Sequence, residues 1–189
     1  MNIQQKGFGL IEVMVSLLIL AVAMLGFTAM QGQAIKATDE SLERTQSLVM
    51  MRNMGEKIRL NPTAITAYQT AINTPTASAP AISCGLYGSD TTVCTPAQLA
   101  AAEAYIYTQD MSNHGFTVNL HACPSTGGQD STNVMYSWCL ISAWGSTTPT
   151  IGSDGDVDCL TPQVTNADTT ITLGGAYHPK ATCMFMEVT

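Results

Sequence analysis

The stretch FGLIEVMVSLLILAVAMLGFTAM, residues 8–30, decides how this chain folds. Its last 18 residues carry no charge, and the whole stretch of 23 residues is long enough to cross a bilayer as an α-helix. Lys6 precedes the stretch and the next basic residue is Lys36, so the positive-inside rule places the N-terminus in the cytoplasm. We therefore expect a single pass through a membrane, with the cysteine-bearing segment outside.

Glu12 stands inside this apolar run and needs an explanation. An ionisable side chain at membrane depth is costly and usually has both a partner and a function. Glu12 also argues against a removable secretory signal, for which Ala21-Val22-Ala23 supplies a small-x-small cleavage pattern. The apolar run continues past Ala23 to Met30, which weakens that alternative further.

The helix is predicted to continue through residues 31–60, which contain no proline. Asn61-Pro62 ends it, because a residue before proline is pushed out of the α region. A helix over residues 8–60 is about 80 Å long at about 1.5 Å per residue. Its second half has one apolar stripe, a shape unsuited to a free monomer. The stripe consists of Ile35, Leu42 and Val49, followed by Met51, Met54 and Ile58.

The sequence Lys6-Gly7-Phe8-Gly9-Leu10-Ile11-Glu12-Val13 resembles the processing site of type IV pilins and their pseudopilin relatives. It departs from the usual pattern only at Gly9, where Thr is more common. The resemblance implies cleavage between Gly7 and Phe8 by prepilin peptidase, followed by N-methylation of Phe8. It also implies that Glu12 pairs with the Phe8 amine of a neighbouring subunit. Such a pair makes two charges tolerable in an apolar medium and fixes the axial register between subunits.

Within that family the amino-acid sequence is most similar to that of the minor pilins of the PilV type. In those proteins a stretch similar to Leu-Leu-Gly-Leu, followed by a Leu-Gln or Met-Gln pair, continues the anchor, and Met24-Leu25-Gly26-Phe27 and Met30-Gln31 stand in these positions. The proline that major pilins usually carry near Ala29 is missing. Residues 94–107, CTPAQLAAAEAYIY, partly resemble a block of the same proteins, with Glu103 and Tyr107 where Asp and Trp are usual. Pseudopilins of type II secretion share the sequence IEVMV, residues 11–15 here, so they remain an alternative.

Six cysteines, all after residue 60, indicate three disulfides made in an oxidising compartment. The alternatives are buried free thiols or a metal site, but the chain has no Cys-x-x-Cys pair, and His121 with Cys123 is a weak ligand pair. Many connectivities are open. The one we predict closes a turn-rich loop, a strand hairpin and the last loop: Cys84–Cys94, Cys123–Cys139 and Cys159–Cys183.

The remaining pattern predicts an α+β head, in which the long helix packs on a small antiparallel sheet. Thr95, Pro96 and Gln98 predict the capped start of a helix that ends before Gly115, with Leu99, Ala102 and Ile106 on its apolar face. The composition from Pro62 to Ser83 predicts little regular structure. Strands are expected at residues 116–123, 134–144, 169–173 and 182–188, with Trp138 and Trp144 in the core or on a sheet face.

The charge pattern excludes some functions. After residue 60 the chain has nine acidic residues and one basic residue, so direct nucleic-acid binding by the head is not expected. Asp154-x-Asp156-x-Asp158 resembles the opening of a calcium loop, but Cys159 and Thr165 stand where that loop needs glycine and glutamate. A solvated acidic loop is the preferred interpretation, so we expect no metal or cofactor. No catalytic motif is present, and we expect no enzyme.

We therefore divide the chain into a leader (1–7), a membrane and filament-core helix (8–30), its amphipathic continuation (31–60) and a disulfide-bonded periplasmic head (61–189). The preferred function is a minor pilin that helps initiate a type IV pilus or enters its fibre, serving twitching motility, adhesion or DNA uptake. Its expected partners are other minor and major pilins, prepilin peptidase and the inner membrane. The alternatives are a type II secretion pseudopilin and a membrane-anchored periplasmic ligand-binding protein.

Overall fold

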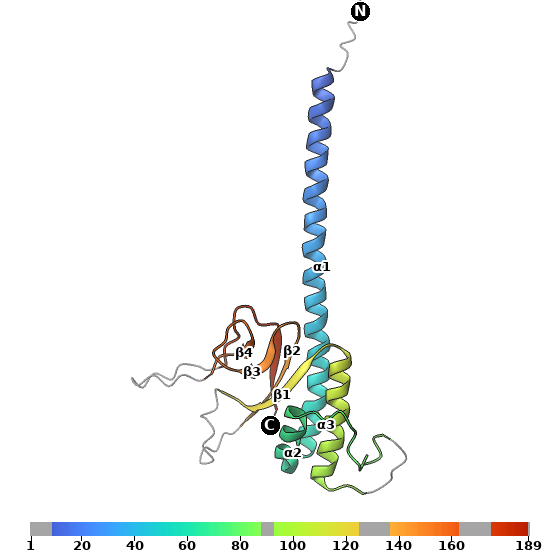
Figure 1. Cartoon of the computed structure of the whole chain (residues 1–189), viewed down its shortest axis with the longest axis vertical. Coiled ribbons are helices and arrows are strands. Elements are labelled where there is room, and N and C mark those ends of the chain that lie inside the picture. Colours follow the sequence, from blue (N-terminus) through green and yellow to red (C-terminus); the bar gives the residue numbers. More distant parts are fainter. Residues whose placement is uncertain (1–8, 88–92, 125–136, 163–174, 189) are drawn as a thin grey trace, which may run out of the picture. The chain divides into compact units, whose positions relative to one another are not determined.

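The computed structural model describes residues 9–87, 93–124, 137–162 and 175–188. Two compact units divide the chain, Met1–Glu43 and Arg44–Thr189, and each is described by itself. Figure 1 labels the elements. In chain order they are α1 (Leu10–Leu60), the 3-10 helix η1 (Pro62–Ala64), α2 (Ile65–Asn73), α3 (Pro96–Asn113), β1 (Thr117–Ala122), β2 (Trp138–Ala143), β3 (Thr148–Ile151), β4 (Asp158–Leu160) and β5 (Cys183–Val188).

α1 confirms the long helix predicted from the apolar run and its continuation. It has 51 residues and ends at Leu60, directly before Asn61-Pro62. Every described residue from Gly9 to Thr45 is exposed, and burial begins only with Ser47 and its neighbours. The predicted stripe therefore divides into a buried part and an exposed part. Met51, Met54 and Ile58 are buried, whereas Ile35, Leu42 and Val49 are 62–64% exposed.

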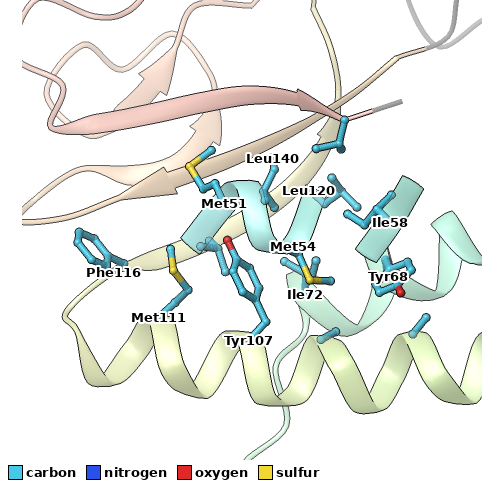
Figure 2. Close-up of a cluster of buried hydrophobic side chains, with 14 of the residues drawn as sticks. Met51, Met54, Ile58, Tyr68, Ile72, Tyr107, Met111, Phe116, Leu120 and Leu140 are labelled. Atoms are coloured by element: carbon cyan, nitrogen blue, oxygen red, sulfur yellow. The ribbon is translucent and has the colours of Figure 1, made fainter. Parts of the chain in front are cut away.

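The second unit is held by a hydrophobic cluster between helices and sheet (Figure 2). The last part of α1 contributes Met51, Met54 and Ile58, so these turns belong to the interior of the head. Full burial of a large apolar side chain stabilises the folded state by roughly 1.5–3 kcal/mol. The other large members are Tyr68, Ile72, Tyr107, Met111, Phe116, Leu120, Leu140, Trp144 and Val188.

β1, β2 and β5 form an antiparallel sheet with β2 in the centre. Because side chains alternate along a strand, Leu140 faces the helices while Ile141 faces the opposite layer. Both faces of β2 are therefore buried, as its continuous apolar sequence predicted. This result confirms the α+β class with a long helix packed on a small antiparallel sheet.

The opposite face of the sheet is covered by a short parallel pair, β3 and β4, which the sequence did not predict. A second cluster, formed by Ile141, Ala143, Cys159, Leu160 and Cys183, fills the space between them. The head thus has three layers, with helices on one side of the main sheet and the β3–β4 pair on the other.

α3 begins as predicted. The Thr95 hydroxyl accepts a hydrogen bond from the Gln98 N–H at 3.3 Å, and the Gln98 side chain accepts one from the Thr95 N–H at 2.9 Å. Gly115 follows the helix end with φ +80°, a backbone conformation that favours glycine. The predicted apolar face was only partly right. Leu99 and Ile106 are partly exposed, and the fully buried positions include Ala100, Ala102, Ala104 and Met111.

The expectation of little regular structure after Pro62 was wrong for its first part. Residues 62–73 form η1 and α2, because Pro62 starts the 3-10 turn and Tyr68 and Ile72, one helical turn apart, are fully buried. Asn73, the last residue of α2, then pairs with the open edge of β1. Its side-chain amide donates to the Leu120 carbonyl at 3.0 Å and accepts from the Leu120 N–H at 2.7 Å.

The predicted strands are found with shorter bounds. β1 lies within 116–123, β5 within 182–188, and β2 covers residues 138–143 of the predicted 134–144. The predicted strand at 169–173 lies outside the described residues, as do residues 134–136. Trp144 is buried in the main cluster and Trp138 packs against it.

Three disulfides are present, and they join the pairs written from the sequence: Cys84–Cys94, Cys123–Cys139 and Cys159–Cys183. The first closes the connection between α2 and α3. The second joins the end of β1 to β2, where His121 and Cys139 are register partners. The third joins β4 to β5 and lies fully inside the second cluster.

Candidate functional site

The first candidate site is the exposed apolar half of α1. Large apolar side chains cover this segment all round, with exposed fractions of 49–78% between Leu10 and Met30. Soluble monomeric proteins rarely expose apolar patches larger than a few hundred Å². α1 is long and apolar enough to cross a membrane by length and composition. A bilayer or the helices of other subunits would cover the same surface.

The hydroxyl side chains of this segment need no outside partner. Ser16 donates to the Glu12 carbonyl at 2.7 Å and Thr28 to the Leu25 carbonyl at 2.9 Å. Thr38, further along, donates to the Ala34 carbonyl at 2.9 Å. Polar groups satisfied inside the helix are what an apolar medium requires.

Glu12 differs from these hydroxyl groups. It lies in the first turn of α1, where its N–H donates to the Gly9 carbonyl at 3.0 Å. Its carboxylate has no hydrogen-bond or ionic partner among the residues that the structure describes. A negative charge at a helix N-terminus is favoured by the helix dipole. Gly7 and Phe8, the predicted cleavage and methylation residues, lie outside the described residues.

A polar network inside the head fixes the end of α1 against α2 and α3. The Tyr68 hydroxyl donates to the Glu103 carboxylate, and Lys57 Nζ lies 3.8 Å from the other Glu103 oxygen. Burial, followed by the hydrogen bond to Glu103, raises the pKa of Tyr68, so this phenol keeps its proton. Asn61, directly after α1, donates to the carbonyl of Pro96 at 2.8 Å and so joins the end of α1 to the start of α3. The sequence singled out Glu103 but contained no signal for this network.

Tyr107, which also stood out in the sequence, has a different environment. It is 8% exposed, and its hydroxyl has no hydrogen-bond partner in the described part of the chain. Figure 2 shows its ring rising from α3 toward the sheet, with the oxygen at the far end. Burial raises the pKa of this phenol. The two tyrosines are therefore both structural, but only Tyr68 has its polar group satisfied.

The acidic loop at residues 154–158 is held by its own hydrogen bonds. The Asp158 carboxylate accepts from the Thr150 hydroxyl at 2.6 Å and from the Asp154 N–H at 2.9 Å. The Asp154 carboxylate accepts from the Asp156 N–H at 3.1 Å, and Asp156 forms a 2.7 Å ion pair with Lys180. Among the described residues no group of three or more His, Cys, Asp or Glu side chains is arranged to hold a metal ion. Its internal hydrogen bonds make residues 154–158 an ordered acidic turn.

Two protein-family models match this chain between residues 3 and 105. Residues 3–28 match the family model of the prokaryotic N-terminal methylation motif, and residues 29–105 match that of type IV pilin Tt1218. No curated protein and no solved structure gives a significant match. The first match spans Gly7, Phe8 and Glu12, and the second spans the rest of α1 and the start of α3.

Proposed function

Because the chain is a type IV pilin, a structural subunit rather than an enzyme, we propose that it is a minor pilin of a type IV pilus. In this proposal prepilin peptidase cleaves the chain between Gly7 and Phe8, and Phe8 is then N-methylated. The subunit waits in the inner membrane with its head in the periplasm. It then moves into a pilus that serves twitching motility, adhesion or DNA uptake.

The observation that carries the proposal is the carboxylate of Glu12, unpartnered among the described residues. Its carboxylate stands on an otherwise internally satisfied apolar helix and has no partner in the described part of the chain. An amine from the first residue of a neighbouring subunit is the partner that the methylation motif implies. Pairing both charges removes the penalty of each in an apolar medium and sets the axial position of one subunit on the next.

The head supports a structural role in the same way. Its core includes the last turns of α1, and three disulfides join its connections and sheet layers. Such a head tolerates an extracellular, oxidising environment. The PilV type is favoured by the sequence similarity of residues 11–37 and of the Cys94–Tyr107 block to such proteins.

The test is the intact mass and N-terminal residue of the chain isolated from native membranes and from sheared filaments. A chain that begins at N-methylated Phe8 and is present in filaments supports the proposal. A chain that begins at Met1 or Met24 contradicts it. Loss of twitching and pili on gene deletion, with exoprotein secretion intact, separates the minor pilin from a type II secretion pseudopilin.

The role of Glu12 is tested by Glu12→Ala. We expect this variant to be cleaved but absent from sheared filaments. Ser16→Ala is the matched control, because the Ser16 hydroxyl is bonded to a carbonyl of its own helix and should not contribute to assembly. Equal amounts of both variants in filaments would contradict the pairing.

A further inference from the structure

Charge is segregated within the head unit. From Arg44 to Leu60, α1 carries four basic residues and one acidic residue. After residue 60, the described chain carries six acidic residues and one basic residue, Lys180. One stretch of helix is thus positive, and the rest of the same unit is negative.

The positive side includes a small hollow with an unusual lining. Arg52, Gly55, Glu56 and Arg59 of α1 surround about 230 Å³ together with Met186 of β5. We call this surface the arginine face. Arg59 forms a 3.0 Å ion pair with Glu56, whereas the Arg52 guanidinium is exposed and has no partner among the described residues. The hollow is large enough for one or two side chains.

The negative side includes a preorganised feature, the acidic turn at residues 152–158 between β3 and β4. Asp154 and Asp156 are exposed, and the hydrogen bonds within the turn fix their main chain. The Lys180 ammonium lowers the pKa of Asp156, and the Thr150 hydroxyl lowers that of Asp158, so these carboxylates remain charged down to acidic pH. A fixed turn loses little conformational entropy when it binds.

We propose that the arginine face of one subunit docks onto the acidic turn of a second copy of this chain, with Arg52 pairing with Asp154. This proposal rests on the proposed function, since it names a contact between neighbouring heads of a filament. Stacking the arginine faces of two copies on each other would place like charges together, whereas the arginine face on the acidic turn pairs opposite charges. When this contact is head-to-tail and its rotation does not close, repeated copies build an open helical filament. The charge segregation therefore fits filament growth.

The first experiment tests the contact on the purified full-length chain in detergent micelles. The Arg52→Lys variant keeps the charge and introduces an amine that a carbodiimide joins to a nearby carboxylate. Mixing isotopically light and heavy chains identifies crosslinks between copies by mass spectrometry. We expect crosslinks between position 52 and Asp154 or Asp156 of the other copy, which decrease at high salt. Inter-copy crosslinks of position 52 that avoid the turn, or none at all, would overturn the proposal.

The second experiment reverses the charges in cells. Arg52→Glu places like charges together, and we expect its amount in sheared filaments to decrease by about tenfold or more, which corresponds to about 1.4 kcal/mol. Adding Asp154→Arg to the same chain recreates the pair with opposite polarity and should restore most of the loss. The matched control, Gln109→Glu with Asn113→Asp, makes the net charge more negative by the same amount as Arg52→Glu. Both positions are exposed on α3, and this control should assemble normally.

The outcomes separate this proposal from the proposed function. If Arg52→Glu is processed at Phe8 and enters filaments as well as the unchanged chain, the contact is wrong and the pilin function stands. If the unchanged chain is never processed or found in filaments, the pilin function fails, and the micelle experiment still decides the contact. Binding of Arg52 only to anionic lipid vesicles, with no crosslink between copies, would also overturn the proposal.

Discussion

The Tyr68 hydroxyl donates a hydrogen bond to the carboxylate of Glu103, and this contact joins α2 to α3 inside the head. Tyr107 lies one helical turn after Glu103 in α3, yet its hydroxyl has no hydrogen-bond partner in the described chain. The same chemical group is therefore satisfied at one buried position and unsatisfied at another. The pair provides an internal comparison of what a buried phenol contributes to stability.

We expect Tyr68→Phe to lower the free energy of unfolding by about 1–3 kcal/mol, because it leaves a partly buried carboxylate without its donor. Tyr107→Phe should be neutral or stabilising by up to about 1 kcal/mol, because it removes a buried hydroxyl that has no partner. Denaturant unfolding of the two variants under identical conditions measures the difference. Equal destabilisation by both variants would contradict the assignment.

Gly55 is expected to be intolerant of a side chain. A Cβ at this position lies 2.9 Å from Met186 Cε and 3.2 Å from Val188 Cγ1, and Val188 is a fully buried β-branched residue. The strain of about 1–3 kcal/mol should exceed the gain of about 1 kcal/mol in helix propensity. Thermal unfolding of Gly55→Ala should therefore show a lower midpoint. Gly32→Ala is the control, since nothing lies within 4 Å of its Cβ position.

Mild acid should weaken the head through His121. Burial lowers the pKa of His121 below its ordinary value of 6.5, and its Nε2 lies 3.2 Å from the Pro149 carbonyl, to which the neutral ring can donate. The folded state thus favours the neutral ring. Its contribution is fully present above about pH 6.5 and is lost as pH falls toward the folded pKa.

The measurement for His121 is the unfolding midpoint in denaturant from pH 7.5 to pH 5. We expect His121→Asn to remove most of the decrease in stability over this range. An unchanged pH dependence in the variant would show that another group is responsible. Below about pH 4, protonation of Asp156 and Asp158, whose pKa values are lowered, should add a further loss.

The disulfides should contribute unequally. Cys159–Cys183 closes a separation of 24 residues and is fully buried between the two sheet layers, whereas Cys84–Cys94 closes a separation of 10. Replacing Cys159 and Cys183 by alanines should lower the free energy of unfolding by about 3–5 kcal/mol and leave a cavity. Replacing Cys84 and Cys94 should lower it by about 2–3 kcal/mol. Unfolding of both double variants measures the order. A larger loss from the Cys84–Cys94 pair would contradict this ranking.

Local signals predicted much of this fold. The apolar run and Pro62 set the bounds of α1, and the Thr95–Gln98 capping box set the start of α3, because each depends on residues close together in the chain. The alternating or continuous apolar patterns located β1, β2 and β5 for the same reason.

The features that were missed depend on distant residues. α2 has only nine residues, and its stability comes from Tyr68 and Ile72 in the core and from Asn73 on the edge of β1. β3 and β4 pair in parallel over a few residues, a non-local contact without a turn signal. On α3, Leu99 and Ile106 were predicted to face the core together with Ala102, but small alanines occupy the close-packed side.

The candidate site was predictable only as far as its motif reaches. Glu12 is recognisable because a charge in an apolar run is rare, whatever surrounds it. The network of Lys57, Tyr68 and Glu103 combines residues of three helices, and nothing in their separate surroundings indicates that they meet. The arginine face likewise needs β5 beside α1, which only the folded head provides.

The last turns of α1 are part of the core of the head, with Met51, Met54 and Ile58 buried beneath the sheet. Mechanical tension along these turns therefore acts directly on the core of the head. It acts as shear on interlocked side chains and is shared with the sheet that covers them. The helix cannot be withdrawn until that core is disrupted, so the head should resist a pulling force as a unit rather than by the strength of a single connecting loop.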